Sequence, residues 1–204
     1  MGSAVSGGGL SALRSPRYRV YAVAALVAVF ALVLSAFVWG PFSHQDAKAS
    51  ASSILSAGLV AQNAGRISEA SDDYHKVLQL DPSNYWAYYN LGVIDHQAGR
   101  LSAAERNYRS ALALNPDLVP ALYNLAILRS GPSPKEADAI YRHAIALEPK
   151  NAAAHLNLGF LLLQEGDTVG GRAELDTAVK LDPQLASRLP PASPTASAAP
   201  SRKP

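Results

Sequence analysis

An Asp, Asn or Glu followed by proline punctuates this chain at nearly equal intervals. The four prolines are 34, 33 and 34 residues apart, at Pro82, Pro116, Pro149 and Pro183. Proline cannot continue a helix, so each of them predicts the end of one. A repeat of this length is long enough for one pair of helices, and such a unit can bury its apolar face only against its neighbours.

The stretch 84–116 shows what one unit contains. An apolar-rich run ends at Ala98-Gly99-Arg100, and a second run starts at Ser102 and stops at the next proline. Glycine readily adopts the left-handed conformation that ends many helices. Ser102 and Glu105 have the spacing of a capping box, and so do Ser133 and Glu136 in the next unit. Each unit is therefore predicted to be two helices joined by a tight turn.

Small residues recur at fixed places in each unit, with one larger side chain between them. The recurring sets are Gly58, Gly92, Ala126 and Gly159; Ala70, Ala104, Ala137 and Gly171; Tyr74, Tyr108, Tyr141 and Leu175; and Val77, Ala111, Ala144 and Ala178. With the period, this pattern resembles the tetratricopeptide repeat (TPR) family over about residues 51–185. Small residues allow two helices to approach closely, and the large ones fill the gaps.

The resemblance implies an all-α superhelix of four helix-turn-helix repeats, at residues 51–84, 85–118, 119–151 and 152–185. The second helix of the last repeat carries Gly170 and Gly171, and each glycine costs roughly 1 kcal/mol relative to alanine. We therefore expect it to be the least stable helix. Residues 186–204 are rich in Pro, Ala and Ser and are expected to be disordered. No capping helix is expected, which leaves open a homo-oligomer formed through the uncapped last repeat.

Residues 20–39 form an uncharged apolar stretch and predict a single transmembrane helix ahead of the repeats. Residues 1–19 are expected to be disordered and basic, and residues 40–50 to form a linker. Arg14, Arg17 and Arg19 precede the span, so the positive-inside bias places the N-terminus inside and the repeats on the extracytoplasmic side of the cytoplasmic membrane. Two alternatives are a signal peptide cleaved after Ala49 and a buried helix of a soluble protein.

By the same resemblance, the first helix of each pair lines a concave groove that binds protein or peptide segments. The groove residues would be Leu55, Leu59, Trp86, Tyr89, Asn90, Val93, Tyr123, Asn124, Ile127, Leu156, Asn157 and Phe160. Most are aromatic or aliphatic, which favours an apolar or aromatic-bearing ligand. The asparagines could grip a peptide backbone, or they could pack between repeats. No Lys or Arg occurs in this set, which argues against a clamp for a terminal carboxylate.

The sequence offers no catalytic, metal or cofactor pattern. Its five histidines are scattered, it has no cysteine, and no Gly-rich phosphate loop occurs. All 16 acidic residues lie between Asp46 and Asp182 with 12 of the 18 Lys and Arg, so this part carries a formal charge of −4 and is a poor candidate for nucleic-acid binding. We expect no enzyme, but a membrane-anchored scaffold or adaptor for envelope assembly or maturation. A cytoplasm-facing adaptor and a secreted soluble binder are the alternatives.

Overall fold

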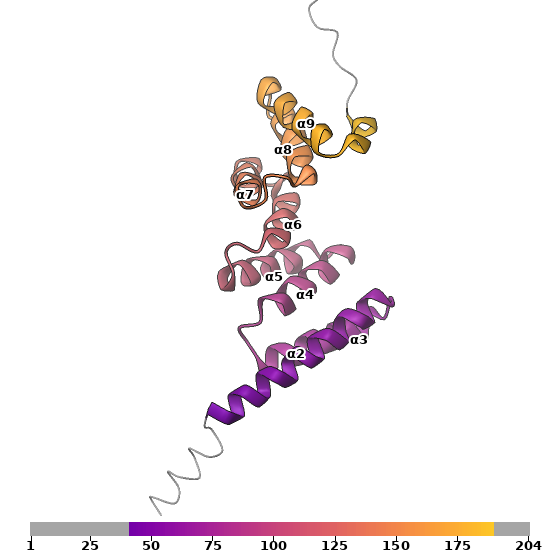
Figure 1. Cartoon of the computed structure of the whole chain (residues 1–204), viewed down its shortest axis with the longest axis vertical. Helices are drawn as coiled ribbons and strands as arrows, with labels where there is room; N and C mark the ends of the chain where they lie inside the picture. Colours follow the sequence, from indigo (N-terminus) through magenta and orange to yellow (C-terminus); the bar gives the residue numbers. More distant parts are fainter. Residues whose placement is uncertain (1–40, 190–204) are drawn as a thin grey trace, which may run out of the picture.

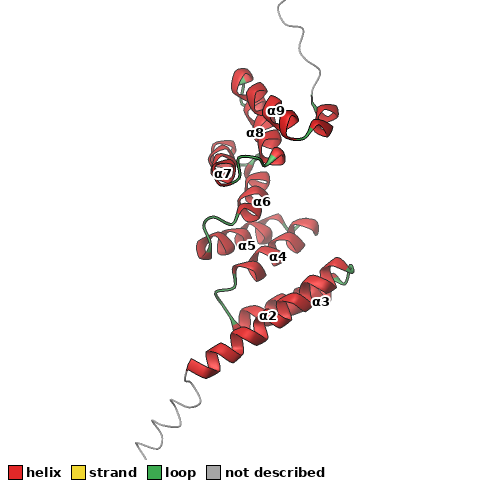
Figure 2. Ribbon diagram, in the orientation of Figure 1, coloured by secondary structure: helices red, strands yellow, loops and turns green. Residues whose placement is uncertain are grey.

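The structure is a computed structural model that describes the backbone of residues 41–189 and the side chains of residues 46–189. All regular elements in this range are helical (Figure 2). They are α2 (Pro41–Asn63), α3 (Ile67–Leu80), α4 (Tyr85–Gln97), α5 (Leu101–Leu114), α6 (Val119–Arg129), α7 (Pro134–Leu147), α8 (Ala152–Gln164), α9 (Thr168–Leu181) and a 3-10 helix, η2 (Pro183–Arg188).

The helices form four antiparallel pairs that stack in chain order. Each pair is a hairpin: α2 with α3, α4 with α5, α6 with α7, and α8 with α9. The second helix of a pair also contacts the first helix of the next pair. Figure 1 shows the stack running from α2 and α3 at one end to α8 and α9 at the other. The expected all-α stack of helix pairs is confirmed.

Local residues set the turns inside and between the pairs. Gly65, Gly99 and Gly166 have φ values of 76°, 72° and 91°, a conformation that other residues rarely adopt. They end the first helix of repeats one, two and four. Asn84 and Asn151 begin α4 and α8 by accepting a hydrogen bond from the amide of Ala87 and Ala154 respectively. Turn glycines and N-caps together fix where each helix starts and stops.

The capping box expected at Ser102 and Glu105 is wrong. The N-cap of α5 is Arg100, which makes no side-chain capping hydrogen bond, and Ser102 lies within the helix. The Glu105 carboxylate instead pairs with Arg109 of the same helix at 3.0 Å and with Arg129 of α6 at 3.3 Å. Two guanidinium groups lie within its reach, and each offers a charge-assisted bond. Glu105 therefore joins two repeats rather than capping one helix.

The turn of the third repeat behaves in a similar way. Ser133 is the N-cap of α7, as expected, and Pro134 takes the first helical position, where proline is favoured. The serine side chain, however, caps no backbone amide. Its hydroxyl accepts a hydrogen bond from Arg129, and Glu136 pairs with the same arginine at 2.8 Å. Without a turn glycine in the left-handed conformation, α6 has 11 residues, against 13 in α4.

The helices of each pair meet through the recurring small residues. Ala70, Ala104 and Ala137 are fully buried. A Cβ atom added at Gly92 would lie 2.6 Å from the Tyr108 ring, so only glycine allows this ring to pack as it does. At Gly171 an added Cβ would lie 2.9 Å from the carbonyl oxygen of Gly159 and 2.8 Å from Leu163. Gly171 therefore lets α8 and α9 approach closely; the low stability of α9 stays a prediction.

The two ends of the described range differ from expectation. Residues 41–50 were assigned to a linker but belong to α2, which begins at Pro41. At the other end, η2 extends beyond the expected last repeat, and Leu185 and Leu189 pack against the cluster around Leu175 in α9. Residues 186–189 are therefore ordered on the last repeat, which is partly covered. The reason is apolar burial, since both leucines leave water by folding back.

Other terminal expectations lie outside the described residues. They are the transmembrane helix at 20–39, the basic segment 1–19 and the tail from residue 190 onward. Within residues 41–189, none of the helices is long and apolar enough to cross a membrane.

Buried tyrosines make the fold sensitive to alkaline pH. Burial raises the pKa of the Tyr74 hydroxyl from 10.0 to about 12, and the neighbouring Asp73 adds to the shift. Burial also raises the pKa values of Tyr108 and Tyr141. The unfolded chain deprotonates tyrosine near pH 10. The tyrosines' contribution to stability is therefore complete below about pH 10 and is lost as the pH rises toward about 12.

We predict that the free energy of unfolding in urea falls steeply between about pH 10 and about pH 12, while tyrosinate absorbance rises. Tyr74→Phe should make the fall shallower, because one of the buried hydroxyls is removed. An unfolding free energy that stays constant over this range would contradict the burial of these hydroxyls.

Candidate functional site

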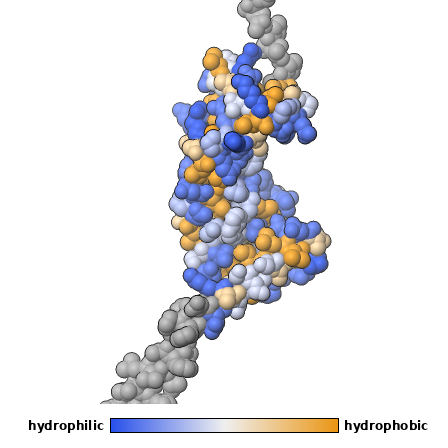
Figure 3. Space-filling view, viewed as in Figure 1, coloured by the Kyte–Doolittle hydropathy of each residue, from blue (hydrophilic) through white to orange (hydrophobic). Residues whose placement is uncertain are grey.

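The first helices of the last three pairs, α4, α6 and α8, line one side of the stack. Figure 3 shows the molecule hollowed on the side between η2 and the α4–α5 pair, with apolar side chains near the hollow. On α4, Trp86 is 40% exposed, while Tyr89 and Val93 are half-buried. Tyr123 of α6 and Phe160 of α8 are half-buried as well. Large apolar side chains are thus open to solvent along this groove.

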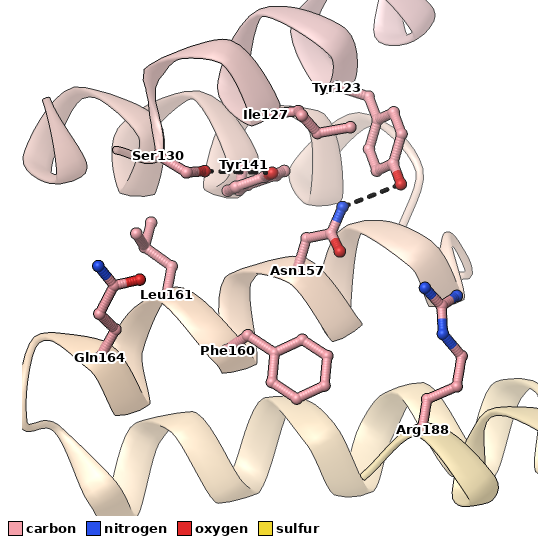
Figure 4. A pocket seen from close by; sticks show the side chains of 9 residues that line it. All are labelled: Tyr123, Ile127, Ser130, Tyr141, Asn157, Phe160, Leu161, Gln164 and Arg188. Atoms are coloured by element: carbon pink, nitrogen blue, oxygen red, sulfur yellow. Dashed lines mark hydrogen bonds between the residues drawn. The ribbon is translucent and has the colours of Figure 1, made fainter. Parts of the chain in front are cut away.

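The structure brings four of the expected groove residues together in one pocket. Tyr123 and Ile127 come from α6, and Asn157 and Phe160 come from α8 (Figure 4). The pocket has a volume of about 430 Å³. Five further residues line it that the sequence did not single out: Ser130, Tyr141, Leu161, Gln164 and Arg188. An apolar side chain of a ligand would fit between the two helices.

The remaining expected residues fall into two groups. Leu156 is 1% exposed and packs with Leu175 and Ala178 inside the α8–α9 pair, so its assignment to the groove surface is wrong. Asn90 is 6% exposed, which leaves little of it for a ligand. Leu156 holds the same repeat position as Tyr123, and it is buried because its cluster is also packed by Leu185 and Leu189 from the end of the chain. The other six expected residues lie outside the pocket: Trp86, Tyr89, Val93, Asn124, Leu55 and Leu59.

Two of the recurring asparagines join neighbouring repeats. Asn157 donates a hydrogen bond from Nδ2 to the Tyr123 hydroxyl at 2.9 Å, and Asn124 donates to the Tyr89 hydroxyl at 3.5 Å. Leu55 occupies the equivalent tyrosine position in the first repeat, so it offers Asn90 no hydroxyl. Asn157 also lies within hydrogen-bonding reach of the buried Tyr141, and Asn124 within reach of the buried Tyr108. The main role of Asn124 and Asn157 is therefore structural, because their hydrogen bonds join neighbouring repeats.

The buried tyrosines Tyr141 and Tyr89 are uncharged at neutral pH. Tyr141 lies beneath Tyr123, with ring centroids 6.3 Å apart in an edge-on arrangement. Burial raises the pKa of Tyr141 above its ordinary value, and a hydrogen bond with Ser130 only partly offsets this. Burial likewise raises the pKa of Tyr89, and the Asn124 bond lowers it in part. These hydroxyls consequently act as neutral hydrogen-bonding groups.

Arg188 is the one charged residue among those that line the pocket. It is the last residue of η2 and falls within the stretch 186–204, which the sequence predicts to be disordered. The signal that could have revealed it is Leu185. It follows Pro183 by two residues, as the buried Leu118 follows Pro116. A leucine at that place indicates that the chain continues onto the last repeat before Pro190.

Other chemistry is limited in the described part of the chain. Between residues 46 and 189, no three His, Cys, Asp or Glu side chains gather as a metal ion would need. The buried His155 contacts Glu174 at 2.6 Å and the carbonyl oxygen of Pro149 at 3.1 Å. Both of its ring nitrogens are engaged in these contacts, so His155 has a structural role between α8, α9 and the preceding turn.

Models of one repeat family match the chain in three segments. The model described as TPR repeat matches residues 63–97, and two described as tetratricopeptide repeat match residues 87–118 and 133–189. Together these segments span more than half of the 204 residues. Comparison with curated proteins gives no match.

Several solved structures share the fold. A crystal structure of MamA aligns with a TM-score of 0.60 and 22% identity over 67% of this chain and 81% of that chain. The pilF protein of Pseudomonas aeruginosa aligns with a TM-score of 0.57 and 20% identity over 68% of each chain. The first TPR unit of Spaghetti (RPAP3), bound to the HSP90 peptide SRMEEVD, has a TM-score of 0.55 and 24% identity over 58% of this chain and 95% of that chain. These identities show a common fold and no more.

The asparagine–tyrosine bonds generate a prediction. Tyr123→Phe removes the acceptor of a 2.9 Å hydrogen bond, and we expect the free energy of unfolding to fall by about 0.5–1.5 kcal/mol. Tyr89→Phe is the matched control, because its 3.5 Å contact is at the limit of a hydrogen bond and its loss should cost less than about 0.5 kcal/mol. Urea unfolding of both variants measures the difference. Equal costs would show that the Asn157 bond does not join the repeats.

Proposed function

The chain belongs to the tetratricopeptide repeat family, and we therefore propose that it is a non-catalytic scaffold or adaptor that binds a segment of a partner protein in the groove of α4, α6 and α8. Proteins of this family generally act as binding scaffolds. One observation carries the proposal for this chain. Aromatic and aliphatic side chains stay partly open along the groove, and an open pocket of about 430 Å³ lies between two of its helices.

The groove chemistry favours an extended, apolar or aromatic-bearing segment. Tyr123, Ile127 and Phe160 provide apolar walls, and Gln164 at the pocket edge offers amide groups to a peptide backbone. A rigid scaffold needs little reorganisation on binding, which favours affinity. The Spaghetti (RPAP3) unit, which shares the fold, was solved with an HSP90 peptide bound, and this supports a peptide as the kind of ligand.

The proposed place of action is the outer side of the cytoplasmic membrane. Its support is the sequence: residues 20–39 are uncharged and apolar, and Arg14, Arg17 and Arg19 precede them. We propose that this segment anchors the chain with its N-terminus inside and the repeats outside, in envelope assembly or maturation. A homo-oligomer through the last repeat is a weaker proposal, because η2 covers part of that face.

A reporter fusion after Pro204 tests the topology. Alkaline phosphatase fused there should be active, and a fluorescent protein that folds only in the cytoplasm should be dark. The reverse result would support a cytoplasm-facing adaptor instead. Recovery of a soluble product that lacks residues 1–49 would support a secreted binder after signal cleavage.

Truncating groove side chains tests the binding proposal. A photo-crosslinking residue at Gln164, on the pocket edge, should capture a protein partner in native cells, and one at the exposed Lys135 of α7 should not. Trp86→Ala with Phe160→Ala should reduce capture about tenfold or more, since buried aromatic anchors contribute over 1 kcal/mol each to binding. These two residues are chosen because they make no side-chain hydrogen bond between repeats, unlike Tyr89 and Tyr123.

The matched control truncates apolar side chains that lie outside the groove. Leu101→Ala with Val169→Ala removes two residues that are 54% and 81% exposed on α5 and α9. Capture at Gln164 should be unchanged in this control. Equal capture by the control and the groove variant would refute binding in the groove.

A further inference from the structure

The pocket between α6 and α8 carries a single charge. Eight of its nine lining residues are apolar or neutral, and none is an Asp, Glu or Lys. The ninth, Arg188, comes from η2 rather than from a repeat helix. Figure 4 shows its side chain reaching from η2 toward the pocket, on the side of Asn157 and Phe160. The sign of charge at this site is therefore set by one residue.

Arg188 is held in place by its neighbours and keeps its charge uncompensated. Leu185 and Leu189, on either side of it, pack against the α8–α9 cluster, and Asp182 caps η2 by accepting a hydrogen bond from the Gln184 amide. Within residues 46–189, no carboxylate lies close enough to Arg188 to form an ion pair. Most other arginines of the repeats are paired; Arg109 and Arg129, for example, share Glu136.

We propose that Arg188 selects the ligand of this pocket, which is an extended peptide segment with a large apolar or aromatic side chain and an acidic residue next to it. The apolar side chain enters between Tyr123, Ile127 and Phe160. The adjacent carboxylate accepts hydrogen bonds from the Arg188 guanidinium. This inference rests on the proposed groove function and adds the chemical class of the partner.

The selection rests on a difference in affinity between acidic and basic ligands, and not on a large gain in affinity for the acidic one. A guanidinium binds a carboxylate through charge-assisted hydrogen bonds, and it repels a lysine placed at the same point. No acidic side chain of the pocket can compensate a basic ligand. Because Arg188 is exposed, solvent screens the interaction, and discrimination of about 1.5-fold to fivefold between Glu and Gln is expected.

A peptide array with the full-length chain as the probe protein tests this inference. Each peptide holds a Phe within a Gly/Ser frame, and the Phe is followed by Glu, Gln or Lys. The parent protein should bind Phe-Glu about 1.5-fold to fivefold better than Phe-Gln, and Phe-Lys least. Arg188→Glu should reverse the order, so that Phe-Lys binds best. Arg172→Glu is the matched control, because Arg172 is an exposed arginine of α9 that does not line the pocket, and it should keep the parent order.

The outcomes separate this inference from the proposed function. Equal binding of all three peptides, lost on Phe160→Ala, would overturn the role of Arg188 and leave the groove function intact. A preference for Phe-Glu that persists in Arg188→Glu would also overturn it. Failure of the parent to bind any of the peptides would count against both. Circular dichroism of Arg188→Glu should match the parent, because the substituted side chain is exposed.

Discussion

The structure depends on how closely the two helices of each pair approach. In the second repeat the Tyr108 ring lies only 2.6 Å from the point that a Cβ atom at Gly92 would occupy, and Ala104 is fully buried in the same cluster as this ring. Such contacts pack the two helices of a pair tightly together. Part of the first helix then faces neither its partner nor the preceding pair, and this part borders the groove. One pair cannot bury its apolar surface alone, so each pair leans on the next. The groove is a consequence of this arrangement.

The groove has a structural role as well as a binding role. The Tyr123 hydroxyl accepts a hydrogen bond from Asn157 of the next repeat, and the Tyr123 ring forms part of the pocket wall. Ion pairs from Glu105 and Glu136 to Arg129 join α5, α6 and α7 at another place. With these neighbouring repeats joined, the pocket between α6 and α8 is largely formed before a ligand arrives. A preformed and mostly neutral pocket makes a single added charge, Arg188, effective in selecting a ligand.

The sequence predicted most of the fold, because period, proline and small residues are all local signals that agree. It predicted the pocket only in part. Tyr123, Ile127 and Phe160 follow from the repeat register. Leu156 has the same register as Tyr123 but is buried, because leucines from the end of the chain pack against its cluster. Arg188 was missed because its position comes from two leucines that fold back, a tertiary effect that composition alone does not show. The capping boxes failed for a similar reason, since distant arginines compete for Glu105 and Glu136.

The most direct test of this account compares two alanine-to-leucine substitutions in α5. Ala104 is fully buried at the helix contact, and Ala113 is exposed on the same helix. Leucine and alanine differ little in helix propensity, so packing decides the outcome. Urea unfolding should show a loss of about 1–3 kcal/mol for Ala104→Leu and a change within about 0.5 kcal/mol for Ala113→Leu. Equal stability of the two variants would contradict the close helix contact from which the groove follows.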